Sequence, residues 1–312
     1  MSTNPFHVPP PPSDQGTLPQ PVNHKSNWVR FNTARRYVVN HLITGLSVLS
    51  TVIVIAPLVA ILIYLVYMGA SSLNLAFFTH IPAPVGETGG GMANAMVGSG
   101  IVLALASLMG VPVGIAAGVY LAEFGRGRML AAAIRFTADV LNGVPSIVMG
   151  ISIYALIVKP QQHYSAFAGG VALAIMMVPT IARTTEEMLA TVPHSIREAA
   201  LGLGVPKWRT VVSVSLKTAS PGIITGCMLA FARVAGETAP LLFTAFGNQF
   251  WSYSLTEPIA ALPLQIYVYA MSPYDEWHRL AWAGSLVLIV MIMVAVTLVR
   301  IYASRGVLKG AS

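Results

Sequence analysis

Six long apolar runs divide this chain, with polar loops between them. A helix needs about 20 apolar residues to cross a hydrocarbon core roughly 30 Å thick, and each run meets that length. The pattern therefore predicts an all-α integral membrane protein with six transmembrane helices. The predicted spans lie near 42–68, 92–121, 138–158, 166–189, 219–246 and 280–302.

Composition supports the same class. Hydrophobic residues make up 55% of the 312 residues and charged residues only 9%, whereas a soluble domain typically has about 25% charged residues. The net charge of +7 does not indicate a nucleic-acid partner, because the basic residues are spread over short loops instead of being massed on one face.

The basic residues also predict the orientation. They collect in the N-terminal tail, in the loops after the second and fourth spans and at the C-terminal end, and are nearly absent from the other loops. By the positive-inside rule, both termini and residues 193–217 are expected to be cytoplasmic. Residues 1–35 are expected to form a disordered proline-rich tail, 36–68 the first transmembrane helix, and 90–303 a permease domain.

Residues 193–217 form a basic, helix-prone loop between the fourth and fifth spans. Ser195 and Glu198 have the spacing of a capping box, which predicts a helix start there. Gly204 stands where a left-handed cap would end this helix, and Pro206 suits the first position of a second one. The loop is expected to be a helix-turn-helix at the membrane surface, ready to enter a groove on a partner.

This loop carries a resemblance to a known family. Glu198-Ala199-Ala200 followed by Gly204 resembles the EAA loop of bacterial ABC-transporter permeases, which docks into the ATPase subunit. The resemblance implies a type I importer permease fold in which these four residues belong to a cytoplasmic coupling helix.

Two charged residues lie in the fifth apolar run. Arg233 is near its midpoint and Glu237 follows one turn later, although a charge at the bilayer centre costs about 2.5–3.5 kcal/mol on insertion scales. The four-residue spacing allows a neutralised pair inside the bundle. The functional alternative is an anion path, in which Arg233 offers forked donors to a tetrahedral oxyanion. Glu237 would then orient Arg233 or accept a proton from hydrogen phosphate.

Other polar and small residues within the spans have open roles. Arg183 is either a second anion station or a snorkelling interface residue. Asp139 is expected to pair locally with Arg135. Gly110, Gly114 and Gly118 place small residues on one helix face and predict close helix packing. Prolines 57, 112, 145, 179 and 240 predict kinks in the spans.

The chain lacks the signatures of several enzyme classes. It has no phosphate-binding loop with a Gly-Lys-Ser/Thr ending, so it is not expected to hydrolyse ATP by itself. The seven histidines show no metal-ligand spacing, and no nucleophile, histidine and acid arrangement stands out. No cofactor or metal is therefore expected in this chain. Cys227, inside an apolar run, is expected to be a buried small hydrophobe.

Several further segments, within about residues 36–303, resemble the phosphate-transporting branch of the permease family: 121–125, 142–150, 183–186, 232–245 and 248–277. The resemblance implies half of a channel in a bacterial inner membrane. It also implies a second phosphate permease subunit, two ATPase subunits that bind ATP and Mg, and an extracytoplasmic phosphate-binding protein. It assigns transport roles to Arg233, Glu237 and Arg183.

The sequence thus predicts a permease subunit, not an enzyme, for inward transport of inorganic phosphate. Two alternatives remain: a permease for another oxyanion such as sulfate or molybdate, and a membrane enzyme that acts on lipid phosphates with Arg233 as a phosphate clamp.

Overall fold

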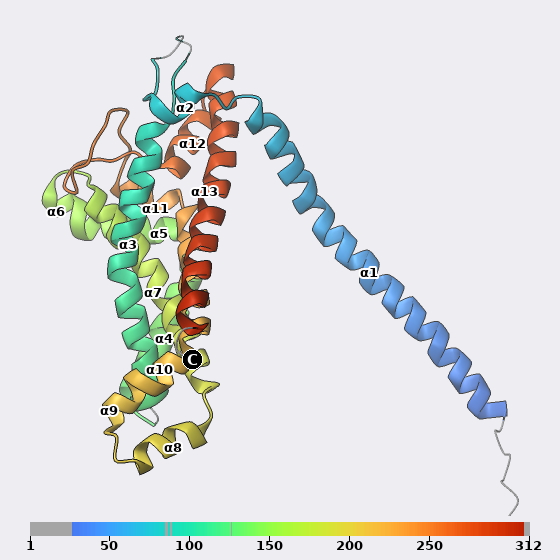
Figure 1. The fold of residues 1–312 in the computed structure, drawn as a ribbon. Coiled ribbons are helices and arrows are strands. Elements are labelled where there is room, and N and C mark those ends of the chain that lie inside the picture. Colours follow the sequence, from blue (N-terminus) through green and yellow to red (C-terminus); the bar gives the residue numbers. More distant parts are fainter. Residues whose placement is uncertain (1–26, 85–86, 88, 126, 309–312) are drawn as a thin grey trace, which may run out of the picture. The chain divides into compact units, whose positions relative to one another are not determined.

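The computed structural model describes residues 27–308 except 85, 86, 88 and 126, with side chains described for 35–301. Within this part of the chain the regular elements are helices, together with one isolated bridge between Phe246 and Ile259. The all-α prediction is confirmed. The helices, drawn in Figure 1, are α1 (Asn27–Ala70), α2 (Leu75–Thr79), α3 (Ala93–Val119), α4 (Met129–Gly143), α5 (Ser146–Ile153), α6 (Lys159–Gln161), α7 (Ala166–Ala190), α8 (His194–Gly202), α9 (Lys207–Thr210), α10 (Leu216–Ala235), α11 (Ala239–Thr244), α12 (Leu262–Ala270) and α13 (Asp275–Leu308). Three π-helical segments interrupt or extend them: η1 (Tyr120–Phe124), η2 (Tyr154–Val158) and η3 (Val211–Ser215).

Five helical segments among the described residues are long and apolar enough to cross a membrane: Arg35–Ala70, Ala93–Phe124, Ala166–Ala190, Lys207–Ala235 and Asp275–Ile301. A sixth crossing requires the pair Met129–Gly143 and Ser146–Gln161, which is bent by 107°. The third span predicted for 138–158 is therefore not one continuous helix. Pro145 has no N–H and pushes the preceding residue into extended backbone, so Val144, with ψ 130°, ends the helix.

The fifth predicted span, 219–246, is also corrected at both ends. Its helix begins at Lys207, because α9 runs through η3 into α10 without a break. The second helix of the predicted helix-turn-helix is thus the start of a span, not a separate surface helix. At the other end α10 stops at Ala235, and a new short helix begins at Ala239 with Pro240 at its second position.

The chain consists of two compact units, Met1–Ile61 and Leu62–Ser312. The proline-rich tail up to residue 26 lies outside the described residues. Residues 27–35, expected to belong to that tail, are instead helical from Asn27. Within the second unit, the last turns of α1 pack on α13, where Tyr64 meets Trp282 edge to face at 5.2 Å between ring centroids.

The core of the second unit is the contact between α3 and α7. A side chain at Gly114 or Gly118 would collide with Ile181 or Thr185, so the glycines let the two backbones approach closely. The predicted packing role of the glycine stripe is confirmed. α10 packs on α7 and also contacts α3, and α13 packs on α10 and α12.

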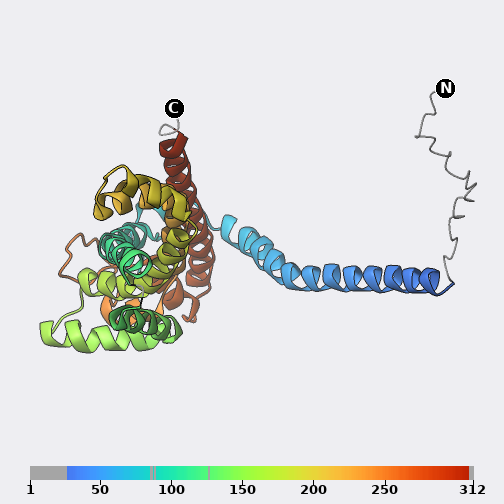
Figure 2. The ribbon, with the colours of Figure 1, turned by 90° about the horizontal axis from the view of Figure 1, so that it is seen from below.

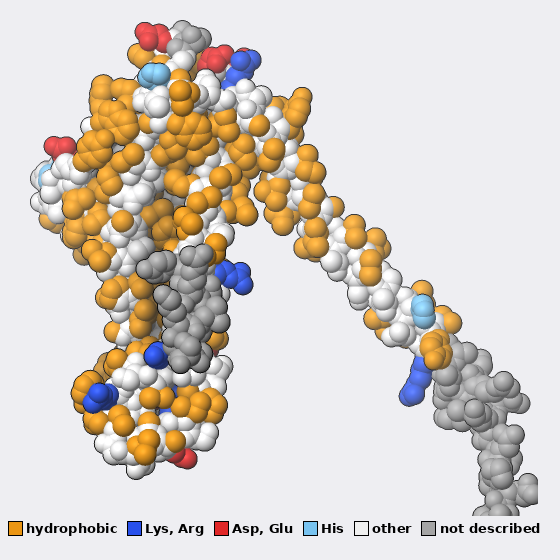
Figure 3. Space-filling view, in the orientation of Figure 1, with side chains coloured by type: hydrophobic (Ala, Val, Ile, Leu, Met, Phe, Trp, Pro, Cys, Tyr) orange, Lys and Arg blue, Asp and Glu red, His pale blue; other side chains and the backbone are white. Residues whose placement is uncertain are grey.

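The two ends of this bundle differ. α2 and α12 lie at one end and α8 with α9 at the other (Figure 1), and Figure 2 views the bundle from the end that carries α8. At the α12 end, the first N–H groups of α7 donate hydrogen bonds to the loop between α11 and α12. Ala166 donates to the Glu257 carbonyl and Phe167 to the Leu255 carbonyl. At the same end Tyr269 is buried and its ring is stacked on that of Trp277. Hydrophobic side chains cover much of the flank between the ends (Figure 3).

Candidate functional site: an exposed short helix and two exposed arginines

The start of α8 differs from the predicted capping box. The helix begins at His194, and Pro193, with φ −58° and ψ 140°, is its N-cap without any side-chain capping bond. The proposed cap residue Ser195 therefore lies inside the first turn, where its hydroxyl cannot play the expected part. The proline ring fixes φ of Pro193, which favours the non-helical backbone conformation that an N-cap residue adopts.

The end of α8 is as predicted. Gly204 has φ +81°, in the left-handed region that favours glycine. The Gly204 N–H donates to the Leu201 carbonyl at 2.9 Å, and the Val205 N–H donates to the Ala200 carbonyl at 3.2 Å. These two bonds form a Schellman motif, which closes the helix and turns the chain towards α9.

Among its described residues, α8 buries none. Glu198 and Ala199 are exposed and Ala200 is half-buried. Ile196, Leu201 and, just beyond the helix, Leu203 are exposed as well, Leu203 by 85%. A helix of nine residues that presents a carboxylate and apolar side chains to the outside has the form of a docking element.

Arg233 and Glu237 do not form the pair that their four-residue spacing allowed. Arg233 lies in the last turn of α10 and is exposed, whereas Glu237 follows the helix and is half-buried. Because α10 ends before Gly236, the helical spacing that would bring these side chains together is lost. No carboxylate among the described residues lies within ion-pair distance of Arg233.

Along the bundle, Arg233 lies opposite the middle of α7, although it is in the last turn of its own helix. Gly226 of α10 packs directly on Thr184 of α7. Arg233 is seven residues further along α10, about 10 Å at 1.5 Å per residue, which brings it near the level of Met177. Phe231 and Met177 line the same cavity, and Met177 lies near the middle of α7.

Arg183 and Arg233 lie on the sides of their helices that face away from α3. On α7, Thr185 contacts α3, and Arg183 is two residues away, about 200° around the helix. On α10, Phe231 lines a cavity with Ser107 of α3, and Arg233 is likewise two residues, about 200°, further on. α7 and α10 are neighbours, and each carries one of these two exposed guanidinium groups.

Arg183 has carboxylate partners, unlike Arg233. Its guanidinium donates to Glu187 at 2.9 Å and approaches Glu186 at 4.0 Å. Arg135 of α4 pairs with Glu186 at 2.8 Å, and not with Asp139 as predicted. Asp139 lies outside this contact and is exposed. The Arg135–Glu186 pair ties α4 to α7 beside the exposed side.

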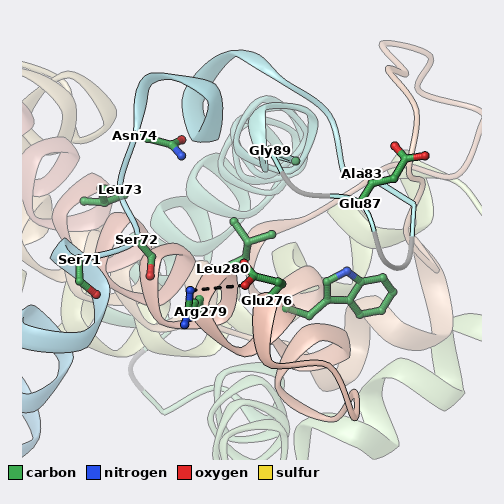
Figure 4. A pocket seen from close by; sticks show the side chains of 12 residues that line it. Ser71, Ser72, Leu73, Asn74, Ala83, Glu87, Gly89, Glu276, Arg279 and Leu280 are labelled. Carbon is green, nitrogen blue, oxygen red and sulfur yellow. Dashed lines mark hydrogen bonds and ion pairs between the residues drawn. The ribbon is translucent and has the colours of Figure 1, made fainter.

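A polar cavity of about 230 Å³ lies at the opposite end of the bundle, between the α1–α2 connection and the start of α13 (Figure 4). Ser71 and Asn74 line it together with Glu87, Glu276 and Arg279. The Arg279 guanidinium forms an ion pair with Glu276 at 3.4 Å, and Glu87 places a second carboxylate in the cavity lining. Two acids and one base do not suit an anion.

Sequence reasoning missed one buried ion pair at the α8 end. Arg197 of α8 lies 2.9 Å from Glu123 of η1, and their side chains are only 14% and 9% exposed. Glu123 is a lone acid at the end of an apolar run, and this signal could have identified it as a residue in need of a partner.

The model of one protein family, described as "binding-protein-dependent transport system inner membrane component", matches residues 110–305. Curated relatives include the "Phosphate transport system permease protein PstA" of Yersinia pestis, 46% identical over 288 residues, covering 92% of this chain and 95% of the relative. The protein of the same name from Haemophilus influenzae is 44% identical over 255 residues, covering 81% and 90%.

Solved structures support the fold alone. The MetNI methionine ABC transporter, in an inward-facing conformation, matches with a TM-score of 0.53 at 20% sequence identity. The match covers 69% of this chain and 95% of the other.

Proposed function

Because the chain belongs to the PstA family of phosphate transport permeases, we propose that it carries phosphate past Arg233. It is a permease subunit of a phosphate ABC importer and a multi-pass protein of the inner membrane. The family implies two kinds of partner, an ATPase and a substrate-binding protein. Within such an importer, this chain would line part of the anion path and contact the ATPase.

The observation that carries the path is the exposed guanidinium of Arg233, which has no ion-pair partner among the described residues and lies opposite the middle of α7. A charge directed at lipid there is costly, so this side must face water or another protein. A guanidinium offers forked N–H donors that match a tetrahedral oxyanion. Arg183, already balanced by Glu187, would be a weaker station further towards the α8 end.

The same observation supports a second permease subunit. The exposed side of α7 and α10 would be covered by the corresponding side of a related subunit, and the path would run between the two. This chain would then supply half of the path. Glu237, half-buried and outside the helix, would either orient Arg233 or receive the proton of hydrogen phosphate, which would favour phosphate over sulfate.

α8 would be the contact for a cytoplasmic ATPase, with Glu198, Ala199 and Ala200 on the docking side and Gly204 closing the helix. ATP and Mg would be bound by two such ATPase subunits, and this chain would hold neither. The orientation is that of the positive-inside rule, with both termini and α8 in the cytoplasm. Transport requires that the ATP-bound partner bind one arrangement of the bundle better than another.

The test is uptake of labelled phosphate by cells that lack their own high-affinity system, with and without this chain and its partner subunits. The expected result is uptake that depends on the chain and that excess sulfate or molybdate does not inhibit. Inhibition by those anions would instead favour the other oxyanions. Turnover of a lipid phosphate by the isolated chain would favour the enzyme.

A further inference from the structure

Arg197 is the most heavily bonded cation among the described residues at the α8 end. Its guanidinium forms the ion pair with Glu123 and donates to the Leu189 carbonyl at 2.6 Å and to the Val192 carbonyl at 3.2 Å. It also reaches the Ser215 hydroxyl at 3.4 Å. One side chain of α8 thus contacts the ends of three spans: α3 through η1, α7, and α10 through η3.

The partners of Arg197 suit a buried cation. Leu189 lies in the last turn of α7 and Val192 just beyond the helix, where the carbonyls carry partial negative charge. Glu123 Oε1 is buried and has no aligned hydrogen bond, so it depends on the charge of Arg197. Breaking such a pair from one side leaves an uncompensated buried charge.

Two of the three span ends reached by Arg197 are π-helical. Glu123 lies in η1 and Ser215 in η3. Single π-helical turns inside α-helices occur frequently at functional sites, because the extra residue per turn weakens the local hydrogen-bond ladder. Both segments connect a span to the region around α8, which makes them positions where a helix end can shift.

A second cation ties the same place from α9. The Lys207 ammonium donates to the Glu123 carbonyl oxygen at 3.0 Å and lies 4.8 Å from the centre of the Phe124 ring. Residues on both sides of the Gly204 turn therefore contact Glu123 of η1. Arg197 binds the Glu123 carboxylate, and Lys207 donates to the Glu123 backbone carbonyl. The turn, η1 and the end of α7 form one connected block.

We propose that Arg197 is a positioning residue that transmits movement of α8 to the spans α3 and α7. The neighbouring residue Glu198 is exposed and would contact the ATPase, whereas Arg197 is bonded to the ends of the spans and would transmit the movement of α8 to them. The inference rests on the proposed function, since α8 must be the docking element. It predicts that a variant without the Arg197 guanidinium still binds the ATPase and still hydrolyses ATP, but transports less phosphate per ATP hydrolysed.

The experiment uses the complete complex of both permeases, the ATPases and the binding protein in lipid vesicles. ATP hydrolysis and uptake of labelled phosphate are measured together, per assembled complex. Arg197→Met is expected to lower the phosphate moved per ATP by about fivefold or more, the lower range of typical coupling factors. Arg128→Met, on an exposed residue of the same end, is the matched control and should leave the ratio unchanged.

Two further variants protect the test against simple misfolding. Glu123→Gln keeps the shape of the acid, leaves Arg197 its carbonyl partners, and should lower the ratio less than Arg197→Met. In the double variant Arg197→Met with Glu123→Gln, no charge is left buried, so it should assemble better than Arg197→Met and show the same low ratio.

Each outcome has one meaning. A wild-type ratio in the assembled double variant would overturn the role of Arg197, as would hydrolysis and uptake that fall in parallel. If Arg197→Met fails to assemble, the double variant decides by the same criterion. Absence of phosphate uptake in the wild-type vesicles would instead contradict the proposed function itself.

Discussion

The Arg183 guanidinium donates to the Glu187 carboxylate across 2.9 Å, one turn along the exposed side of α7. This pair is half open to the surroundings, with the two side chains 52% and 57% exposed. Arg233, on the neighbouring helix, has no such acid among the described residues. The two arginines therefore differ in how they can bind an anion. Arg233 can bind it directly, whereas the Arg183 guanidinium must first separate from the Glu187 carboxylate.

The first prediction follows from this difference. Arg233→Gln should abolish phosphate uptake, because the neutral amide cannot replace a forked cation at mid-depth. A loss of at least about 3 kcal/mol of stabilisation, typical for removing one partner of a desolvated charge contact, corresponds to more than 100-fold. Arg183→Gln should lower uptake less, by about tenfold or below. Uptake is measured in cells at matched membrane levels of each variant.

A control defines what this comparison means. Arg279→Gln removes an exposed guanidinium paired with Glu276 at the other end of the bundle, and uptake should stay near that of the wild type. If Arg233→Gln transports as well as this control, the anion path past Arg233 is wrong, and α8 alone supports the transport mechanism.

The second prediction concerns the docking side of α8. Glu198→Ala alters an exposed side chain and should change the permease's own stability by less than about 0.5 kcal/mol. It should nevertheless reduce uptake severely, because the contact it removes lies in the complex with the ATPase. Co-purification of the ATPase with the permease measures the contact directly. Full co-purification together with full uptake would contradict the docking role.

The turn after α8 allows a third prediction. At φ +81° an alanine is strained, so Gly204→Ala should destabilise the turn by about 1 kcal/mol or more. Asparagine tolerates left-handed backbone better, which makes Gly204→Asn the matched variant. The expected order of ATP-dependent uptake is wild type, then Gly204→Asn, then Gly204→Ala. Equal uptake by both variants would mean that the conformation of this turn does not matter.

The sequence predicted these features to different degrees for physical reasons. Gly204 was correctly placed, because a positive φ is a local demand that one residue type meets best. The predicted capping box was wrong because the helix begins two residues earlier than expected for Ser195 as N-cap. Pro193, with its fixed φ, is the N-cap instead. The Arg233–Glu237 pair failed because the spacing argument assumed a helix that continues past Gly236.

Long-range partners could not be obtained from local spacing. Arg135 lies four residues from Asp139, yet it pairs with Glu186, 51 residues away, because α4 packs on α7. The bend before Pro145 likewise divides a run that is apolar throughout, and hydropathy alone does not register a change of direction. Arg197 and Glu123 are a further case, since their pairing depends on how α8 returns to the end of α3.

A fourth prediction addresses the core. A β-branched side chain at Gly114 would meet Ile181, with its Cβ 2.7 Å from the Ile181 Cβ, so Gly114→Val should force α3 and α7 apart. Overpacking of this kind typically costs about 1–3 kcal/mol, and the thermal midpoint of the purified complex should fall. Gly100→Val, on the same helix with no neighbour within 4 Å, is the control. Equal midpoints would contradict the close approach of the two helices.

The orientation is tested by the last prediction. Met129, 91% exposed at the α8 end, and Phe250, 69% exposed at the α12 end, should lie on opposite sides of the membrane. Single cysteines at each position, in a Cys227→Ser background, are reacted with a thiol reagent that cannot cross the bilayer. In intact spheroplasts Phe250→Cys should react and Met129→Cys should not, and inside-out vesicles should reverse the result. The opposite pattern would place α8 outside, where no ATP is available, and the coupling of α8 to an ATPase would be excluded together with the mechanism that depends on it.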